Sequence, residues 1–269
     1  MKKYIRFGIA LFAFLFVLFS QNHFLVEAKE KKQKAANEYT VPNHVLNISK
    51  ENTFPNTSED QEIVEPSEAT KKLIKEAKIS IENPDLIKML NETTIKPSPI
   101  AIGYRGMVFL GRWALNYDSK ETSTNWEYQK INKNELNNQG SDESQKISYH
   151  QEEQKEIKGA LTNKIAKPEQ IKQMMLLKAK EKTKLPLSYQ TTIGKGTKKD
   201  QTYAVPTDKY GYLHAYSPAI SEKGQVTFGE VYIQLKGSKK KIIIKNVTKQ
   251  GIGAWIPIQD HVSFSFQLR

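Results

Sequence analysis

The chain has 269 residues and a formal net charge of +12, and 38% of its residues are hydrophobic. This length allows one or two domains with a real core, while a mean hydropathy of −0.60 excludes a polytopic membrane protein. Cysteine is absent, which excludes disulfides, thiolate metal sites, thiol nucleophiles and a lipid-anchored cysteine.

The first 28 residues have the three parts of a secretory signal peptide. Three basic residues precede Phe7–Phe19, which is an unbroken apolar run, and Val26 and Ala28 fit the small-residue positions of a cleavage site. The run has 13 residues, which is short of the roughly 20 needed to cross a bilayer. We therefore predict a signal peptide over residues 1–28 and an extracytoplasmic protein, secreted or envelope-associated. The alternative is an anchor helix that is not cleaved.

A polar, extended arm is expected over residues 29–66, because Pro42, Pro55 and Pro66 interrupt it. Within the arm, residues 45–48 could add one short strand. Residues 67–269 are predicted to form a single α+β domain, mainly an antiparallel sheet with two or three short-to-medium helices.

Two short helices are expected to open this domain. Ser67 is a suitable N-cap for the first, and Asn83 caps the second, with Pro84 in its first turn. A third helix is predicted over Pro168–Lys184, where an apolar stripe recurs at i, i+3, i+4 and i+8 and Pro186 ends the helix.

The rest of the domain reads as strands. Aromatic and branched residues favour strands over 101–117 and 124–132, followed by a polar loop over 133–146 and a strand or hairpin over 147–165. After the third helix, "SEKG" (221–224) predicts a hairpin turn, and "KGSKK" predicts a second one. The segment "HVSFSFQLR" alternates as a half-buried strand does.

Two basic segments hold the excess charge. Residues 167–200 carry nine lysines against three acids, and residues 223–249 carry seven against one. Lysines beside apolar strands are common gatekeepers against edge-to-edge aggregation. They could also contact an anionic wall polymer or membrane surface, or pair with the acidic arm. The candidate polyanion contacts are Lys198, Lys199, Lys239, Lys240 and Lys241.

A second candidate is a ligand face on the strand "YGYLHAY". Its period of two places four side chains on one side, namely Tyr210, Tyr212, His214 and Tyr216. Such a row could stack a sugar or handle a proton, although tyrosines also suit an ordinary half-buried sheet face.

No known catalytic spacing is present: the sequence has neither a zinc-binding His-Glu-x-x-His, a Gly-x-Ser-x-Gly elbow nor a phosphate-binding loop. We therefore assign no catalytic residue, metal or cofactor, and whether the protein is an enzyme stays open, with a non-enzyme favoured. Nucleic acid is not an expected partner, because no aromatic residues interleave with the lysines.

Several segments together resemble the YfkD-like family: "PNHVLNISKENTFPN", "NWEYQKIN", "LPLSY", "GTKKDQ", "GYLHAYSPA" and "GIGAWIPIQDHVSFSF". The resemblance covers residues 42–269 and implies an exported protein of Bacillus and related Gram-positive bacteria. It implies no mechanism and transfers no site residue. The expected function is therefore a non-catalytic binding or scaffolding role in the cell envelope, aided by electrostatic attraction. The alternative is a glycan-binding module or hydrolase that uses the face around His214.

Overall fold

The computed structural model describes residues 40–57, 63–97, 103 and 105–269. The predicted signal peptide therefore lies outside the described residues. A compact unit extends from Val41 to Arg269. Its helices are α2 (Glu68–Lys75), α3 (Pro84–Glu92) and α4 (Pro168–Thr183). Its strands are β1 (Val45–Asn47), β2 (Arg105–Asn137), β3 (Gln145–His150), β4 (Lys155–Lys158), β5 (Ala160–Leu161), β6 (Gln190–Ile193), β7 (Lys198–Val205), β8 (Tyr210–Lys236), β9 (Lys239–Pro257) and β10 (His261–Leu268).

The described chain is mostly antiparallel sheet with three helices, as the residue pattern predicts. The main sheet has the order β1-β10-β8-β9-β5, and β2 pairs with the free side of β8. Two separate ribbons, β3-β7 and β4-β6, complete the strands. Residues 45–47 of the predicted arm belong to this unit, because β1 pairs with β10, whereas residues 29–39 of the arm lie outside the described residues.

All three helices begin where the sequence indicates. The Ser67 hydroxyl accepts a hydrogen bond from the Thr70 amide, and the Asn83 side chain accepts from the first amides of α3. In α4 the predicted apolar stripe is buried, including Ile171, Met175 and Ala179. Local sequence rules are sufficient here because caps and stripes involve neighbours in the chain.

The predicted hairpin at 221–224 is wrong, because β8 passes straight through it as one strand of 27 residues. The polar residues there are paired inside the sheet. The carboxylate of Glu222 is fully buried and accepts hydrogen bonds from the hydroxyls of Tyr117, Ser119 and Thr122. Gly224 permits close strand contact, since a Cβ on it would lie 2.3 Å from the carbonyl oxygen of Asp118.

The expected break between the strands over 101–117 and 124–132 is also absent, since residues 105–117 of the first and all of the second belong to β2. β2 continues to Asn137, so the predicted loop shrinks to residues 138–144. The "KGSKK" hairpin is confirmed: Gly237 and Ser238 form the turn between β8 and β9, and Gly237 has a φ of +56°. A positive φ suits glycine, which has no Cβ to clash.

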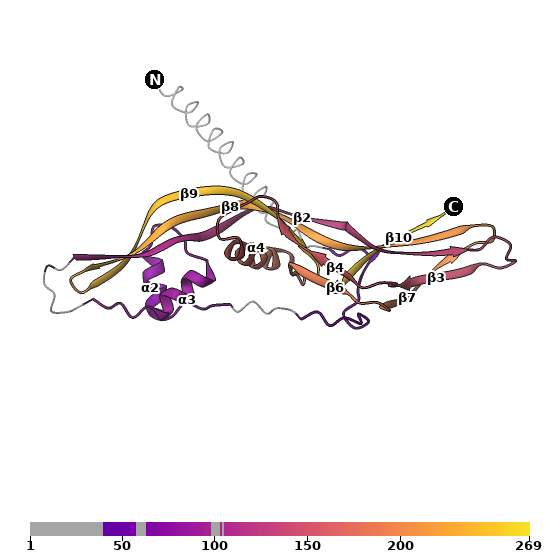
Figure 1. Ribbon diagram of the computed structural model, residues 1–269, viewed down its shortest axis with the longest axis horizontal. Helices are drawn as coiled ribbons and strands as arrows, with labels where there is room; N and C mark the ends of the chain where they lie inside the picture. The colour runs from indigo at the N-terminus through magenta and orange to yellow at the C-terminus, as the bar shows by residue number, and fades with distance from the viewer. Residues whose placement is uncertain (1–39, 58–62, 98–102, 104) are drawn as a thin grey trace, which may run out of the picture. The chain divides into compact units, whose positions relative to one another are not determined.

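Different elements pack beneath different parts of β8 (Figure 1). At its first residues, a core cluster joins β8 and β10 to β3 and β7 through residues such as Leu213 and Tyr149. At its last residues, a second cluster joins β8, β9 and β2 to α2 and α3 through residues such as Val231 and Leu86. Helix α4 packs on the strands between them. Each end of β8 thus has one face packed on a core, and its opposite face is not part of either core.

Candidate functional site

The predicted ligand face lies on the first seven residues of β8. Tyr210, Tyr212, His214 and Tyr216 are half-buried, while the residues that alternate with them are buried. Leu213 and Ala215, which lie between them, belong to the core above β3 and β7. The tyrosine and histidine side chains therefore point to the outer face of the sheet, where a ligand can reach them.

Cations from the neighbouring strands flank these rings. The strand register places Lys130 opposite Tyr216 and Lys133 opposite His214. The Lys133 ammonium lies 4.7 Å from the Tyr212 ring centroid, and the Arg269 guanidinium lies 5.7 Å from it. We call this surface the aromatic–basic strip and define it as Tyr210, Tyr212, His214, Tyr216, Lys130, Lys133 and Arg269.

The rings of the strip are arranged in a row. Tyr210 and Tyr212 are nearly parallel, with an interplanar angle of 11° and centroids 6.4 Å apart. His214 and Tyr216 follow with centroids 6.5 Å apart. Glu135 is the carboxylate of β2 that faces this row, and it forms an ion pair with Lys133. The strip therefore combines stacked aromatic faces with more positive than negative charge.

The surroundings of His214 favour its neutral form by lowering its pKa. Burial lowers the pKa of its imidazole, and the positive charges of Lys130, Lys133 and Arg269 lower it further. Within the described part of the chain, its Nδ1 atom is buried and has no hydrogen-bond partner. A general acid or base is normally oriented by a second group. His214 lacks one among the described residues, so its geometry fits a contact surface better than proton transfer.

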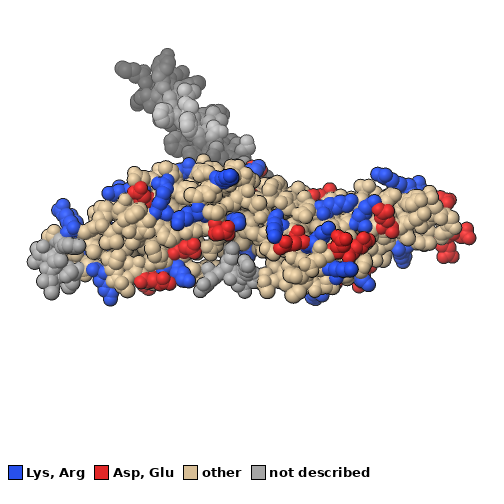
Figure 2. Space-filling view, viewed as in Figure 1, with Lys and Arg blue, Asp and Glu red and all other residues tan. Residues whose placement is uncertain are grey.

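The predicted polyanion lysines do not form one surface. Lys198 and Lys199 lie on β7 beside β3, near the start of β8. Lys239, Lys240 and Lys241 pair with the last three residues of β8. A strand of 27 residues spans roughly 85 Å, so the two groups are at opposite ends of it. On the face drawn in Figure 2, basic and acidic side chains are interspersed rather than gathered in one field.

Some of this charge is neutralised within the chain. Lys199 pairs with Glu51 of the predicted arm at 2.6 Å, and this hydrogen bond lowers the pKa of the Glu51 carboxyl. Lys241 lies 3.6 Å from the Glu76 carboxylate. Lys240 turns toward the core side, and burial lowers its pKa. Of the five predicted lysines, Lys198, Lys239 and Lys240 have no carboxylate within ion-pair distance in the described residues, whereas Lys199 and Lys241 do.

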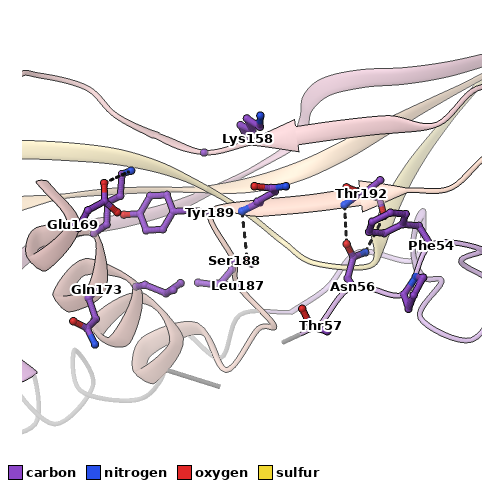
Figure 3. Close-up of a pocket in the computed structure, with 15 residues that line it drawn as sticks. Phe54, Asn56, Thr57, Lys158, Glu169, Gln173, Leu187, Ser188, Tyr189 and Thr192 are labelled. Carbon is purple, nitrogen blue, oxygen red and sulfur yellow. Dashed lines mark hydrogen bonds and ion pairs between the residues drawn. The ribbon is translucent and has the colours of Figure 1, made fainter. Parts of the chain in front are cut away.

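A cleft of about 670 Å³ was not predicted from the sequence (Figure 3). It lies between α4, the β4-β6 ribbon and residues 54–57. Its lysines are already paired, because Lys172 contacts Glu169 at 2.9 Å and Lys158 contacts Glu156 at 2.9 Å. Each lysine of the cleft is thus matched by a carboxylate, so the cleft carries no excess of positive charge and suits a neutral ligand better than an anion.

The wall of the cleft at residues 54–57 is fixed by two asparagines. The side-chain amides of Asn52 and Asn56 donate to the Asp260 carboxylate at 2.8 and 2.6 Å and to the Thr192 carbonyl at 2.9 and 2.8 Å. Asp260 therefore binds the two asparagines and does not orient His261. The Nδ1 atom of His261 lies 2.7 Å from the backbone carbonyl oxygen of Gln259. These contacts are structural, since they tie the arm to β6 and β10.

Two features are absent from the part of the chain that the structure describes. No group of three or more His, Cys, Asp and Glu side chains is placed to hold a metal ion there. No helix in that part of the chain is long and apolar enough to span a membrane.

The comparisons with known proteins agree with the resemblance found in the sequence. The model of the YfkD-like protein family matches residues 42–269. The chain belongs to this family. A curated relative from Bacillus subtilis (strain 168), named Uncharacterized protein YfkD, is 56% identical over 234 residues, which cover 87% of this chain and 89% of the relative. No solved structure matches the chain. The matched region of this YfkD-like protein includes the strip and the cleft.

Proposed function

We propose that this YfkD-like protein is an exported, non-catalytic binding protein of the cell envelope, and that its aromatic–basic strip binds an anionic wall polymer. The basic, apolar and small-residue pattern of residues 1–28 supports export. The observation that carries the binding proposal is the position of two cations, Lys133 and Arg269, over the ring of Tyr212.

The strip fits a polymer that alternates sugars with phosphates. Same-face residues of a strand recur about every 7 Å, so the row of rings offers successive apolar surfaces along one line. The C–H faces of sugars can stack on such rings, while cations beside the rings pair with phosphate oxygens. An open row on a sheet accommodates a long chain, which an enclosed pocket does not.

The electrostatic part of this binding is weak for each contact and depends on salt. Ion pairs between exposed groups contribute about 0.2–1 kcal/mol each. The Debye length is about 8 Å at physiological ionic strength, so distant charges add little. Useful affinity therefore requires several contacts along one polymer, and many repeats of the polymer raise the effective concentration.

The test is sedimentation of the purified protein with purified Gram-positive cell walls. We expect retention at low salt, loss of retention at high salt, and loss on walls from which the phosphate polymers have been removed by acid. The double variant Lys133→Gln/Arg269→Gln should bind about tenfold more weakly. Lys198→Gln, which removes an exposed lysine of β7 outside the strip, is the matched control and should bind normally.

Two results would overturn the proposal. Equal binding by the double variant and the wild type would exclude the strip as the site. Binding to stripped walls that does not respond to salt would favour the alternative of a neutral-glycan module on the same row of rings.

A further inference from the structure

The far end of β8 carries a second surface, on the three strands around the β8-β9 turn. There β8 pairs with the start of β2 on one side and with the start of β9 on the other. Helices α2 and α3 cover one face of these strands through a cluster that includes Val231 and Ile242. Because side chains alternate along a strand, the residues between these two sets point to the opposite face.

Large apolar side chains lie exposed on that opposite face. Phe109 of β2 is 56% exposed and Met107 is 45% exposed. Phe109 is in register with Tyr232, which is in register with Ile243 of β9. The Phe109 and Tyr232 rings are 5.0 Å apart, so these side chains form one continuous patch. Contiguous exposed apolar groups usually mark a binding surface.

Cations lie beside the patch on the same face. Lys236 belongs to β8, and the strand register aligns Arg105 and Lys239 with Lys236 and Arg112 and Lys245 with Glu230, four and two positions from Tyr232. Lys241 is aligned with Gln234 of this face, but its ammonium lies 3.6 Å from the Glu76 carboxylate at the end of α2, so we leave it out. The Lys245 ammonium lies 5.1 Å from the Tyr232 ring centroid. The one carboxylate that the register places on this face is Glu230, which accepts hydrogen bonds from Tyr232 and Asn246 at 2.8 and 2.9 Å. We call this surface the tip face.

A gatekeeper role does not account for the whole tip face. Gatekeeper lysines flank apolar strands and keep them from pairing with other chains. Here the apolar side chains of Phe109 and Met107 are themselves exposed, on β2 beside β8. Lysine stems and aromatic rings together are typical of surfaces that lie at the boundary between lipid headgroups and acyl chains.

We propose that the tip face binds the surface of an anionic phospholipid bilayer. Phe109 and Met107 enter the headgroup region, and the surrounding lysines and arginines pair with the lipid phosphates. Clusters of four to eight basic residues are attracted to anionic lipid, and apolar anchoring together with charge gives stable association where either alone does not. This partner differs from the wall polymer proposed for the strip, and neither proposal depends on the other.

The test uses the full chain and two kinds of vesicle, one of pure phosphatidylcholine and one with 30% phosphatidylglycerol. Residues 1–28 carry an apolar run with three basic residues before it and can add to binding on both kinds of vesicle, so each variant is compared with the wild type on the same vesicles. We expect binding to be at least tenfold tighter on the anionic vesicles. The triple variant Lys236→Gln/Lys239→Gln/Lys245→Gln should lose that preference. A matched variant with the same loss of charge elsewhere, Lys146→Gln/Lys155→Gln/Lys198→Gln, should keep it.

A local reporter separates insertion from simple charge attraction. In Phe109→Trp, the tryptophan fluorescence emission should shift to shorter wavelengths on anionic vesicles but not on neutral ones. The shift is measured after subtracting the shift that the wild-type tryptophans show on the same vesicles. Phe109→Ser should weaken binding at least fivefold while circular dichroism shows a folded chain. Anionic vesicles that bind the triple variant as well as wild type would overturn the proposal, and so would an unshifted Phe109→Trp emission on bound vesicles. Wall binding by the strip should be unchanged in all these variants.

Discussion

The two ends of β8 face outward with the same residue parity but with different chemistry. At the start, the even-numbered residues are Tyr210, Tyr212, His214 and Tyr216, and the cations come from β2 and the C-terminal residue. At the end, the apolar groups are fewer and more exposed, and cations of three strands surround them. A row of rings with few cations suits a chain laid along it, whereas a compact apolar patch inside a basic rim suits a flat, charged interface. One strand can thus present two unlike surfaces, because the outward-facing side chains at each end, rather than the backbone, determine the chemistry of that surface.

The largest expected effect is on stability, and it tests whether the folding of both ends depends on the buried polar network in the middle of β8. Glu222 is fully buried between them, and Glu222→Ala would leave the Tyr117 hydroxyl without its carboxylate partner. Buried polar groups left unpaired cost about 1–3 kcal/mol each. We expect Glu222→Ala to lower the free energy of unfolding by about 3 kcal/mol, measured by urea denaturation.

The control for this change is Glu121→Ala, which removes an exposed carboxylate paired with Lys223 at 3.3 Å. Exposed pairs contribute little, so this variant should change stability by less than about 1 kcal/mol. A loss below about 1 kcal/mol in Glu222→Ala would show that the buried network is not what keeps β8 continuous.

A second prediction concerns the first end alone. Asn56 holds the arm on β6 through its side-chain amide and through its oxygen, which accepts from the Thr192 amide at 2.8 Å. We expect Asn56→Ala to cost about 2 kcal/mol, because several hydrogen bonds of one part-buried group are lost together. Hydrogen exchange should accelerate at Thr192 and leave the amides of Ile242 and Ile244 unchanged. Equal acceleration at both places would mean that the two ends unfold as one unit.

Local patterns in the sequence predicted the parts of the fold that depend on chain neighbours. Ser67 and Asn83 cap helices as expected, and Gly237 forms the predicted turn. The alternation around His214 correctly places four side chains on one face. These features were accessible because caps, turns and strand faces are set within a few residues.

Features that depend on distant residues were not accessible. The polar run at 221–224 looked like a turn because its partners lie about a hundred positions earlier, in Tyr117, Ser119 and Thr122. The cleft draws its walls from four separate segments, so no single window contains it. The exposure of Phe109 could not be predicted for another reason: an apolar residue in a strand is normally expected to be buried.

A third prediction tests whether the two surfaces act separately. The strip variant Lys133→Gln/Arg269→Gln should lose about tenfold in wall binding and keep the preference for anionic vesicles. The triple lysine variant at the β8-β9 turn should do the reverse. A tenfold change corresponds to about 1.4 kcal/mol, which a few exposed charge contacts can supply. Parallel losses in both assays would mean that general charge, rather than placement, controls both kinds of binding.

The smallest expected effect is a pH dependence at the strip that the tip face lacks. Among the described residues, the groups that face His214 are Lys130, Lys133, Arg269 and Glu135. Because burial and these cations lower the pKa of His214 below its ordinary 6.5, the folded state favours the neutral ring. The unfolded chain then binds more protons just below pH 6.5, so stability from this group is complete above that pH and falls as the pH drops through the folded pKa.

Binding should respond with the opposite sign. Protonation of His214 adds a positive charge to the strip, so acidification from pH 7.5 to 5 should tighten binding to a phosphate polymer by up to a few-fold, and His214→Gln should abolish the change. At the tip face Glu230 has its pKa lowered by hydrogen bonds from Asn246 and Tyr232, so it stays ionised over this range. Vesicle binding should therefore stay constant between pH 5 and 7.5. Two results would contradict this prediction. Acidification could strengthen wall binding and vesicle binding equally, or His214→Gln could keep the pH dependence of wall binding. In either case His214 would not be the group that makes the two ends respond differently to pH.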